Sequence, residues 1–145
     1  MFHLIQIPPQ NIRAFWPMCS NLLERAIALT DGATSSEREL ERALCGDTQV
    51  WAVVEENGKD KRLKAIGITS IQLNADGSKT ANIEQFSGDD MNLWFDRKQE
   101  FEAWAVAEGC RDIRIWARKG WSKPLKEYRT THFIMKKVLH KEHAL

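Results

Sequence analysis

Residues 79–110 read KTANIEQFSGDDMNLWFDRKQEFEAWAVAEGC, and this stretch decides the fold class. Its first part, Lys79–Phe86, has the composition of a strand. Asp89-Asp90 then open a long helix, because carboxylates are stabilised at the positive end of the helix dipole. Apolar residues recur along that helix at spacings of three, four and seven, namely Met91, Trp94, Phe101, Trp104 and Ala105. Gly109 ends the helix and Asp112–Ala117 forms the next strand, so the stretch predicts a strand–helix–strand crossover.

Two further strands precede this crossover. Gln49–Glu55 and Leu63–Leu73 are rich in β-branched residues, and Asn57-Gly58 between them is a typical hairpin turn. Asp76-Gly77 makes a second turn before Lys79. The sequence therefore predicts three consecutive antiparallel strands.

The N-terminal part predicts one more strand and two helices. Leu4–Ile7 is a short strand that Pro8-Pro9 closes, because proline cannot donate to a ladder. Asn11 can cap the helix that follows. Thr34-Ser35-Ser36-Glu37 has the form of a capping box, which predicts a second helix ending at Gly46.

The C-terminal part completes the order. A short helical turn is expected between Gly120 and Pro124, and His132–Leu139 has the composition of a last strand. The whole order is then β-α-α-β-β-β-α-β-α-β with a central mixed, mostly antiparallel sheet. We expect an α+β fold in a single domain, residues 1–145.

Two stretches carry a resemblance to a known family. Gln85-Phe86-Ser87-Gly88-Asp89-Asp90 stands where the GNAT superfamily of acyl-CoA-dependent N-acyltransferases has Gln/Arg-x-x-Gly-x-Gly/Ala; Asp90 departs from that pattern. Residues 109–121, GCRDIRIWARKGW, with LKEYR at 125–129 and KKVL at 136–139, look like a GNAT-like group encoded by tailed bacteriophages. The element order fits the same superfamily, so the resemblance covers essentially the whole chain and implies a GNAT-like fold.

The resemblance implies acetyl-CoA as the cofactor, held by Gln85, Gly88, Asp89 and Asp90. Backbone amides at a helix N-terminus bind a pyrophosphate, and glycine allows the close approach. Asp89 and Asp90 oppose this, since two like charges about 4 Å apart repel by about 4 kcal/mol at an effective dielectric near 20. The alternative is that both carboxylates only cap the helix.

The resemblance also implies two catalytic residues. Glu84, on the strand before the loop, would assist deprotonation of the amine, and Tyr128 would protonate the leaving thiolate. Each has a plainer alternative. Glu84 would be a surface carboxylate on the sheet, and Tyr128 would be a packing residue.

The C-terminal segment is basic and aromatic. Residues 111–145 hold 10 Lys and Arg against 3 Asp and Glu, whereas residues 1–110 hold 11 against 17. Interleaved aromatic and basic side chains can anchor a protein partner or stack bases. The candidates are Trp116, Arg118, Lys119, Trp121 and Lys123. In the alternative interpretation, Trp121 packs beneath its own short helix and the charges are solvated.

Three functions remain open at this point. The first is acetyl-CoA-dependent N-acetyl transfer to an unknown acceptor, with weak activity. The second is a catalytically inactive GNAT-derived phage protein that binds another protein, during virion assembly or on a host target. The third is nucleic-acid binding through the basic 111–141 segment, which would weaken steeply with salt.

Several classes are excluded by composition. The apolar runs are too short for a transmembrane helix, and Met1–Leu4 does not begin a secretory signal. Three widely spaced cysteines form neither a disulfide framework nor a zinc site, and the four histidines form no metal pair, so no metal is expected. We expect a cytoplasmic protein, in the host cytoplasm or the virion if phage-encoded, as a monomer or homodimer.

Overall fold

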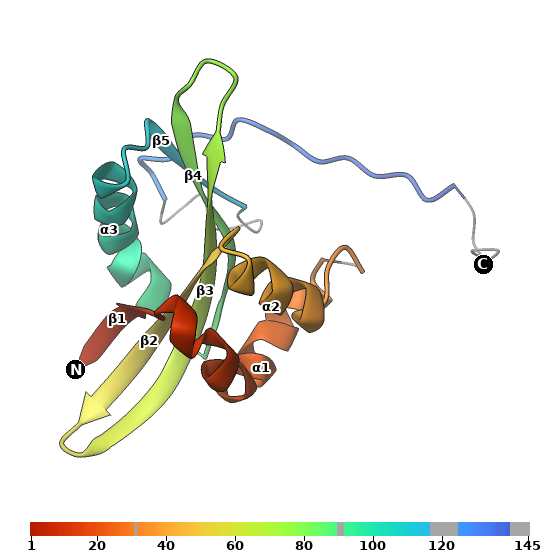
Figure 1. Ribbon diagram of the computed structural model, residues 1–145. Coiled ribbons are helices and arrows are strands. Elements are labelled where there is room, and N and C mark those ends of the chain that lie inside the picture. The colour runs from red at the N-terminus through yellow and green to blue at the C-terminus, as the bar shows by residue number, and fades with distance from the viewer. Residues whose placement is uncertain (31, 90–91, 117–124, 140–145) are drawn as a thin grey trace.

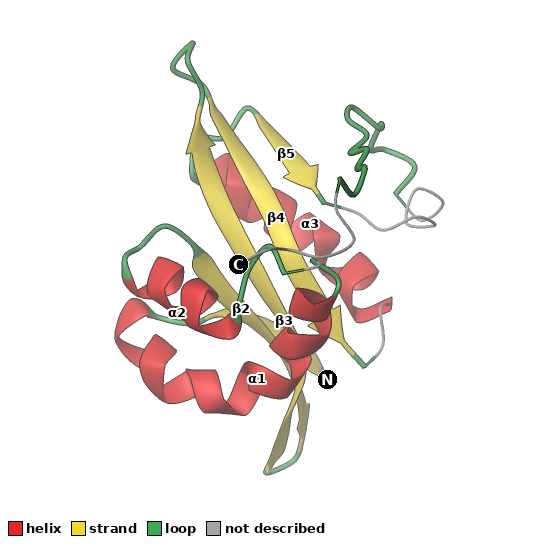
Figure 2. Cartoon of the chain, turned by 90° about the vertical axis from the view of Figure 1, so that its right-hand side faces the viewer, coloured by secondary structure: helices red, strands yellow, loops and turns green. Residues whose placement is uncertain are grey.

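The computed structural model describes residues 1–30, 32–89, 92–116 and 125–139. Its centre is one five-stranded sheet whose strands follow in sequence order (Figures 1 and 2). These are β1 (Phe2–Gln6), β2 (Gln49–Asn57), β3 (Asp60–Leu73), β4 (Lys79–Gly88) and β5 (Asp112–Ile115). The first four pair antiparallel, and β5 pairs parallel to β4. The predicted α+β class and mostly antiparallel sheet are confirmed.

The turns of the meander form as the sequence predicts. Gly58 and Gly77 both have positive φ, 63° and 89°, the backbone region that glycine adopts at little steric cost. The long β2–β3 and β3–β4 ladders therefore start from local turn chemistry.

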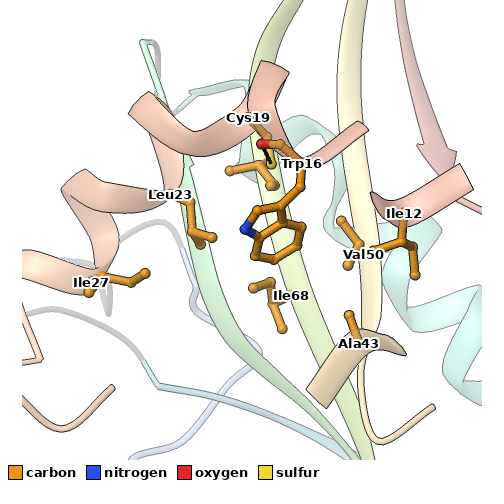
Figure 3. Close-up of a cluster of buried hydrophobic side chains, with 9 residues drawn as sticks. Ile12, Trp16, Cys19, Leu23, Ile27, Ala43, Val50 and Ile68 are labelled. Atoms are coloured by element: carbon orange, nitrogen blue, oxygen red, sulfur yellow. Dashed lines mark hydrogen bonds between the residues drawn. The ribbon is translucent and has the colours of Figure 1, made fainter. Parts of the chain in front are cut away.

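Helices cover both faces of the sheet. α1 (Ile12–Ala28), preceded by the short 3₁₀ turn η1 (Pro9–Asn11), and α2 (Ser36–Leu44) lie on one face, and α3 (Asn92–Ala107) lies on the other (Figure 1). Two separate hydrophobic clusters result. The first packs α1 and α2 on β2 and β3, with Trp16, Leu23, Val50 and Ile68 among its members (Figure 3).

The second cluster lies under α3. Phe101 of that helix is fully buried, and its ring meets Trp51 edge-on at a centroid distance of 5.2 Å. Ile113 and Ile115 of β5 pack against the same cluster. The crossover helix is therefore held by aromatic contacts to the central strands.

The start of α2 differs from the predicted capping box. Ser35, not Thr34, is the N-cap, and its hydroxyl accepts from the backbone amide of Arg38 at 3.2 Å. Thr34 instead donates to Glu39, the buried acidic residue of α2, at 2.8 Å. Trp16 donates to the Ser36 hydroxyl at 3.0 Å, which ties α1 to this cap.

The predicted last strand is wrong. Residues 132–139 form no strand and are exposed, and the chain runs away from the sheet over this segment (Figure 1). A β pattern becomes a strand only when a neighbouring strand completes its ladder, and no described strand lies beside it. The expected helical turn between Gly120 and Pro124 lies outside the described residues.

The described residues contain neither a membrane-spanning helix nor a cluster of metal-binding side chains. None of the helices described is long and apolar enough to cross a membrane. Within the same residues, no three His, Cys, Asp or Glu side chains gather as a metal site would require.

Candidate functional site

A pocket of about 690 Å³ opens between the α1–α2 unit and strand β4. α1 and the following loop form one wall, α2 contributes charged side chains, and β4 with the end of β5 forms the floor. The lining residues are Ala26, Leu29, Thr30, Ala33, Thr34, Arg38, Glu39, Arg42, Glu84, Gln85, Phe86, Trp116 and Ile134. Its volume is that of a small-molecule site, and its lining combines six apolar residues with seven polar or charged ones.

Strand β4 carries a bulge at the floor of this pocket. Ile83 pairs with Thr69 and Gln85 pairs with Ile68, so Glu84 is the extra residue between them. A bulge takes one residue out of the ladder and redirects its side chain, and bulges are frequent beside active sites. Here the Glu84 side chain is directed to α2.

Glu84 is engaged in a two-pronged ion pair. Arg42 donates to its two carboxylate oxygens at 2.7 and 2.9 Å, and the Glu84 side chain is only 7% exposed. Arg42 also contacts Glu39 at 3.2 Å. The hydrogen bond to Glu84 raises the pKa of the Arg42 guanidinium further, against an opposing effect of desolvation. Both carboxylates in the pocket thus share one cation.

The turn between β4 and α3 is closed by contacts of the chain itself. A Cβ on Gly88 would lie 2.7 Å from Ala65 Cβ and 2.9 Å from the Lys64 carbonyl oxygen, so packing against β3 already requires glycine. The Asp89 amide donates to that same carbonyl at 3.3 Å. The Asp89 carboxylate accepts from Arg25 of α1 at 3.0 Å, and both side chains are more than half exposed. Asp90 lies outside the described residues.

Tyr128 is on the other face of the sheet. Its ring packs against the cluster under α3, and its hydroxyl donates to Glu102 of α3 at 2.6 Å. Burial, and then the Glu102 hydrogen bond, raise the pKa of this phenol well above its usual value. The structure therefore does not bring Glu84 and Tyr128 together, since one faces α2 and the other α3.

Comparison with known proteins gives a fold but no close relative. No family model matches the chain, and no curated protein matches it in sequence. Solved structures do match over nearly the full length. A probable acetyltransferase superposes with a TM-score of 0.66 at 10% identity, covering 97% of this chain and 99% of that one.

Two other matches are of the same kind. An aminoglycoside acetyltransferase from an uncultured soil metagenomic sample, in complex with sisomicin, has a TM-score of 0.64, 11% identity and coverage of 99% and 96%. Glucosamine-6-phosphate N-acetyltransferase from Arabidopsis thaliana has a TM-score of 0.60, 15% identity and coverage of 97% and 99%. The chain has the GNAT fold. The implied fold is thus confirmed, while a phage origin stays a prediction.

The GNAT fold explains where the site residues lie. Gln85 reaches the pocket from β4, and Trp116 reaches it from the position just after β5. Trp116 is 62% exposed and lies on the pocket side of the sheet, whereas Ile113 and Ile115 pack under α3, as strand alternation predicts. The expected cofactor-binding and catalytic roles stay predictions for six residues, namely Gln85, Gly88, Asp89, Asp90, Glu84 and Tyr128. The expected partner-binding roles also stay predictions for four residues outside the described part of the chain, namely Arg118, Lys119, Trp121 and Lys123.

Arg42 and Glu39 are site residues that sequence analysis missed. The Glu39–Arg42 spacing on α2 is a helical ion-pair pattern and could have been found. The main partner of Arg42, Glu84, is 42 residues further along the chain, and no local pattern relates the two.

Proposed function

We propose that the chain binds acetyl-CoA in the pocket beside β4 and acts as an N-acetyltransferase of low efficiency. The observation that carries this proposal is the coincidence of the pocket with the bulge at Glu84, on a fold shared with acetyltransferases. When bound, acetyl-CoA supplies an activated acetyl group, whose carbon–sulfur bond is exchanged for a carbon–nitrogen bond to an amine.

The described pocket residues would bind the acetyl group and hold the site in place. The apolar wall, with Ala26 and Leu29, excludes water from the acyl group, and Gln85 offers a polar contact beside it. Arg42 and Glu84 act as positioning residues that hold α2 against the sheet. Since both pocket carboxylates are paired with Arg42, the amine would lose its proton to solvent, and the departing CoA thiolate would take up a proton from solvent.

We expect low catalytic efficiency because the turn between β4 and α3 offers a pyrophosphate few free hydrogen-bond donors. The Asp89 amide is already bonded to Lys64, and the carboxylate of Asp89 adds negative charge beside it. A pyrophosphate would find fewer donors there than an open helix N-terminus provides. The same turn supports the second candidate, a protein that has lost cofactor binding and acts by binding a partner.

Calorimetric titration and thermal unfolding with acetyl-CoA test the proposal. Binding at 100 times the dissociation constant should stabilise the fold by about 2.7 kcal/mol. Ala33→Trp, at an exposed position of the pocket wall, should weaken binding at least tenfold. Ala75→Trp in the β3–β4 hairpin is the matched control and should bind as the parent protein does. No stabilisation at millimolar acetyl-CoA, or equal binding by both variants, would overturn the proposal.

A further inference from the structure

The sheet face that carries the pocket is polar where α1 and α2 do not cover it. Figure 2 shows these two helices over the lower part of the face, with no described helix in front of β5 or of the hairpin ends of β3 and β4. Side chains of three neighbouring strands meet on this uncovered part, and we call them the polar tract. They are Ser70 and Gln72 of β3, Asn82 of β4 and Arg114 of β5.

Arg114 is held in place by the other side chains of the polar tract. Its Nε donates to Asn82 Oδ1 at 3.0 Å, and its Nη2 donates to Gln72 Oε1 at 2.6 Å. Asn82 is only 5% exposed and donates in turn to the Ser70 hydroxyl at 3.4 Å. The guanidinium thus reaches from β5 across β4 to β3. Because its rotamer freedom is already lost in the folded protein, a ligand that binds it pays less conformational entropy.

No carboxylate in the described part of the chain lies within ion-pair distance of Arg114. Arg111, by contrast, contacts Asp76 at 3.0 Å and Asp112 at 3.6 Å. Asp112 also accepts from Thr80 at 2.6 Å. A guanidinium has five N–H donors, and the amides of the polar tract take only two of those of Arg114. Arg114 is half-buried, so the remaining donors can be reached by an anion.

The polar tract continues the pocket along the sheet. Glu84 and Trp116 line the pocket, and Asn82 and Arg114 precede them by two residues. Residues two apart on a strand share a face, and Asn82 pairs with Arg114 in the parallel ladder. At about 3.3 Å per residue and about 4.8 Å between strands, the backbones at Glu84 and Arg114 are roughly 8 Å apart. One small ligand can therefore reach both.

The two ends of this surface differ in charge. At the pocket floor Glu39 and Glu84 share Arg42, which leaves one negative charge in excess and favours an ammonium group. Arg38 also lines the pocket, but it is exposed and donates to the Ala33 carbonyl oxygen, so solvent screens its charge. At the other end Arg114 supplies a positive charge that no described carboxylate compensates.

We propose, building on the proposed function, that the acceptor is a small primary amine with a carboxylate group, and that Arg114 binds this carboxylate. A carboxylate fits better than a phosphate, because one guanidinium neutralises one charge and Asp112 lies two residues away on β5. Arg114 determines specificity without contacting the reacting atoms. Acceptors without the carboxylate should therefore show a raised KM and a nearly unchanged kcat.

Calorimetric titration with three amino acids and their amides, in the absence of acetyl-CoA, tests the carboxylate site. The acids are 4-aminobutanoate, 6-aminohexanoate and 8-aminooctanoate, which sample the distance between amine and carboxylate. At least one acid should bind tenfold more tightly than its uncharged amide. No such preference up to about 20 mM would overturn the assignment. Tighter binding of 6-aminohexyl phosphate than of 6-aminohexanoate would overturn the choice of carboxylate.

Variants show whether the preference depends on Arg114. Arg114→Gln should abolish the preference for the acid. Arg111→Gln is the matched control, because it removes the same charge nearby from a side chain already paired with Asp76, and it should keep the preference. Arg114→Lys keeps the charge but not the forked geometry, and its preference should be at least threefold smaller than that of the parent protein. Equal losses in Arg114→Gln and Arg111→Gln, or an unchanged preference in Arg114→Lys when Arg114→Gln does not fold, would overturn the role of Arg114.

The outcomes separate this site from the proposed transferase activity. Acetyl-CoA binding without a preference for the acid would overturn the carboxylate site and leave the transferase function standing. A preference that depends on Arg114, in a chain that does not bind acetyl-CoA, would overturn the transferase function and leave a binding site for amines with a carboxylate.

Discussion

The ion pair between Arg42 and Glu84 should contribute substantially to stability, and a double-mutant cycle can measure it. Glu84 is nearly buried, Arg42 is one-third exposed, and the two make two short hydrogen bonds. Removing one partner of a fully buried pair costs about 3–5 kcal/mol, because the other charge is left without compensation. Solvent access to Arg42 reduces this, so Arg42→Met should cost about 2–3 kcal/mol.

The cycle consists of Arg42→Met, Glu84→Gln and the double variant. Glu84→Gln keeps the shape of the side chain and one hydrogen-bond acceptor, and Arg42 keeps its ion pair with Glu39. This substitution should therefore lower the free energy of unfolding by about 1–2 kcal/mol. The double variant should cost less than the sum by about 1 kcal/mol, since residues in direct contact are coupled. Urea unfolding followed by tryptophan fluorescence and far-ultraviolet circular dichroism gives the free energies, provided that the denaturant slope stays constant.

Arg25→Met is the matched control. Arg25 and Asp89 form an ion pair at 3.0 Å, but both side chains are more than half exposed. Exposed pairs contribute about 0–1 kcal/mol, so this substitution should lower the melting temperature by no more than a few degrees. An Arg42→Met cost no larger than that of Arg25→Met, or an additive double variant, would refute the reasoning.

Three further predictions concern single residues. Gly88→Ala should destabilise the fold by about 2 kcal/mol in urea unfolding, because its Cβ would overlap Ala65; a cost below about 0.5 kcal/mol would contradict the packing argument. The raised pKa of Tyr128 means that the unfolded chain ionises first, so stability should fall as pH rises above about 10. Tyr128→Phe should remove that part of the fall, and identical pH profiles between pH 9 and 11 would disprove the assignment. Burial raises the pKa of Cys19 to about 11, so an aromatic disulfide reagent at pH 8 should label the other two cysteines and leave Cys19 unmodified until the protein unfolds.

The sequence predicted the elements whose causes are local. The hairpins at Gly58 and Gly77 arise from turn residues that adopt positive φ, and the long helix from apolar residues at helical spacing. The first strand, the two N-terminal helices and the crossover were predicted within a few residues for the same reason. The cap of α2 was placed one residue off, because two hydroxyl residues precede that helix and the Glu39 contact decides between them.

The C-terminal strand shows the limit of a local pattern. His132–Leu139 has a strand-like composition, yet a strand exists only where a neighbour completes its hydrogen bonds, and the described chain provides none there. Gly88 shows a second limit. Sequence analysis connected it with a phosphate, whereas the approach of Ala65 is sufficient to require glycine.

The sequence by itself thus determined the order of the elements as far as β5, because turn residues and apolar periodicity act over a few residues. Tertiary structure alone decided which of the candidate residues meet and how they are paired. The bulge at Glu84 depends on the register between two strands, and its ion pair joins residues 42 positions apart. Tyr128 was directed to Glu102, away from the pocket, by packing on the opposite face of the sheet. Such contacts depend on how whole elements pack, so no spacing within the sequence encodes them.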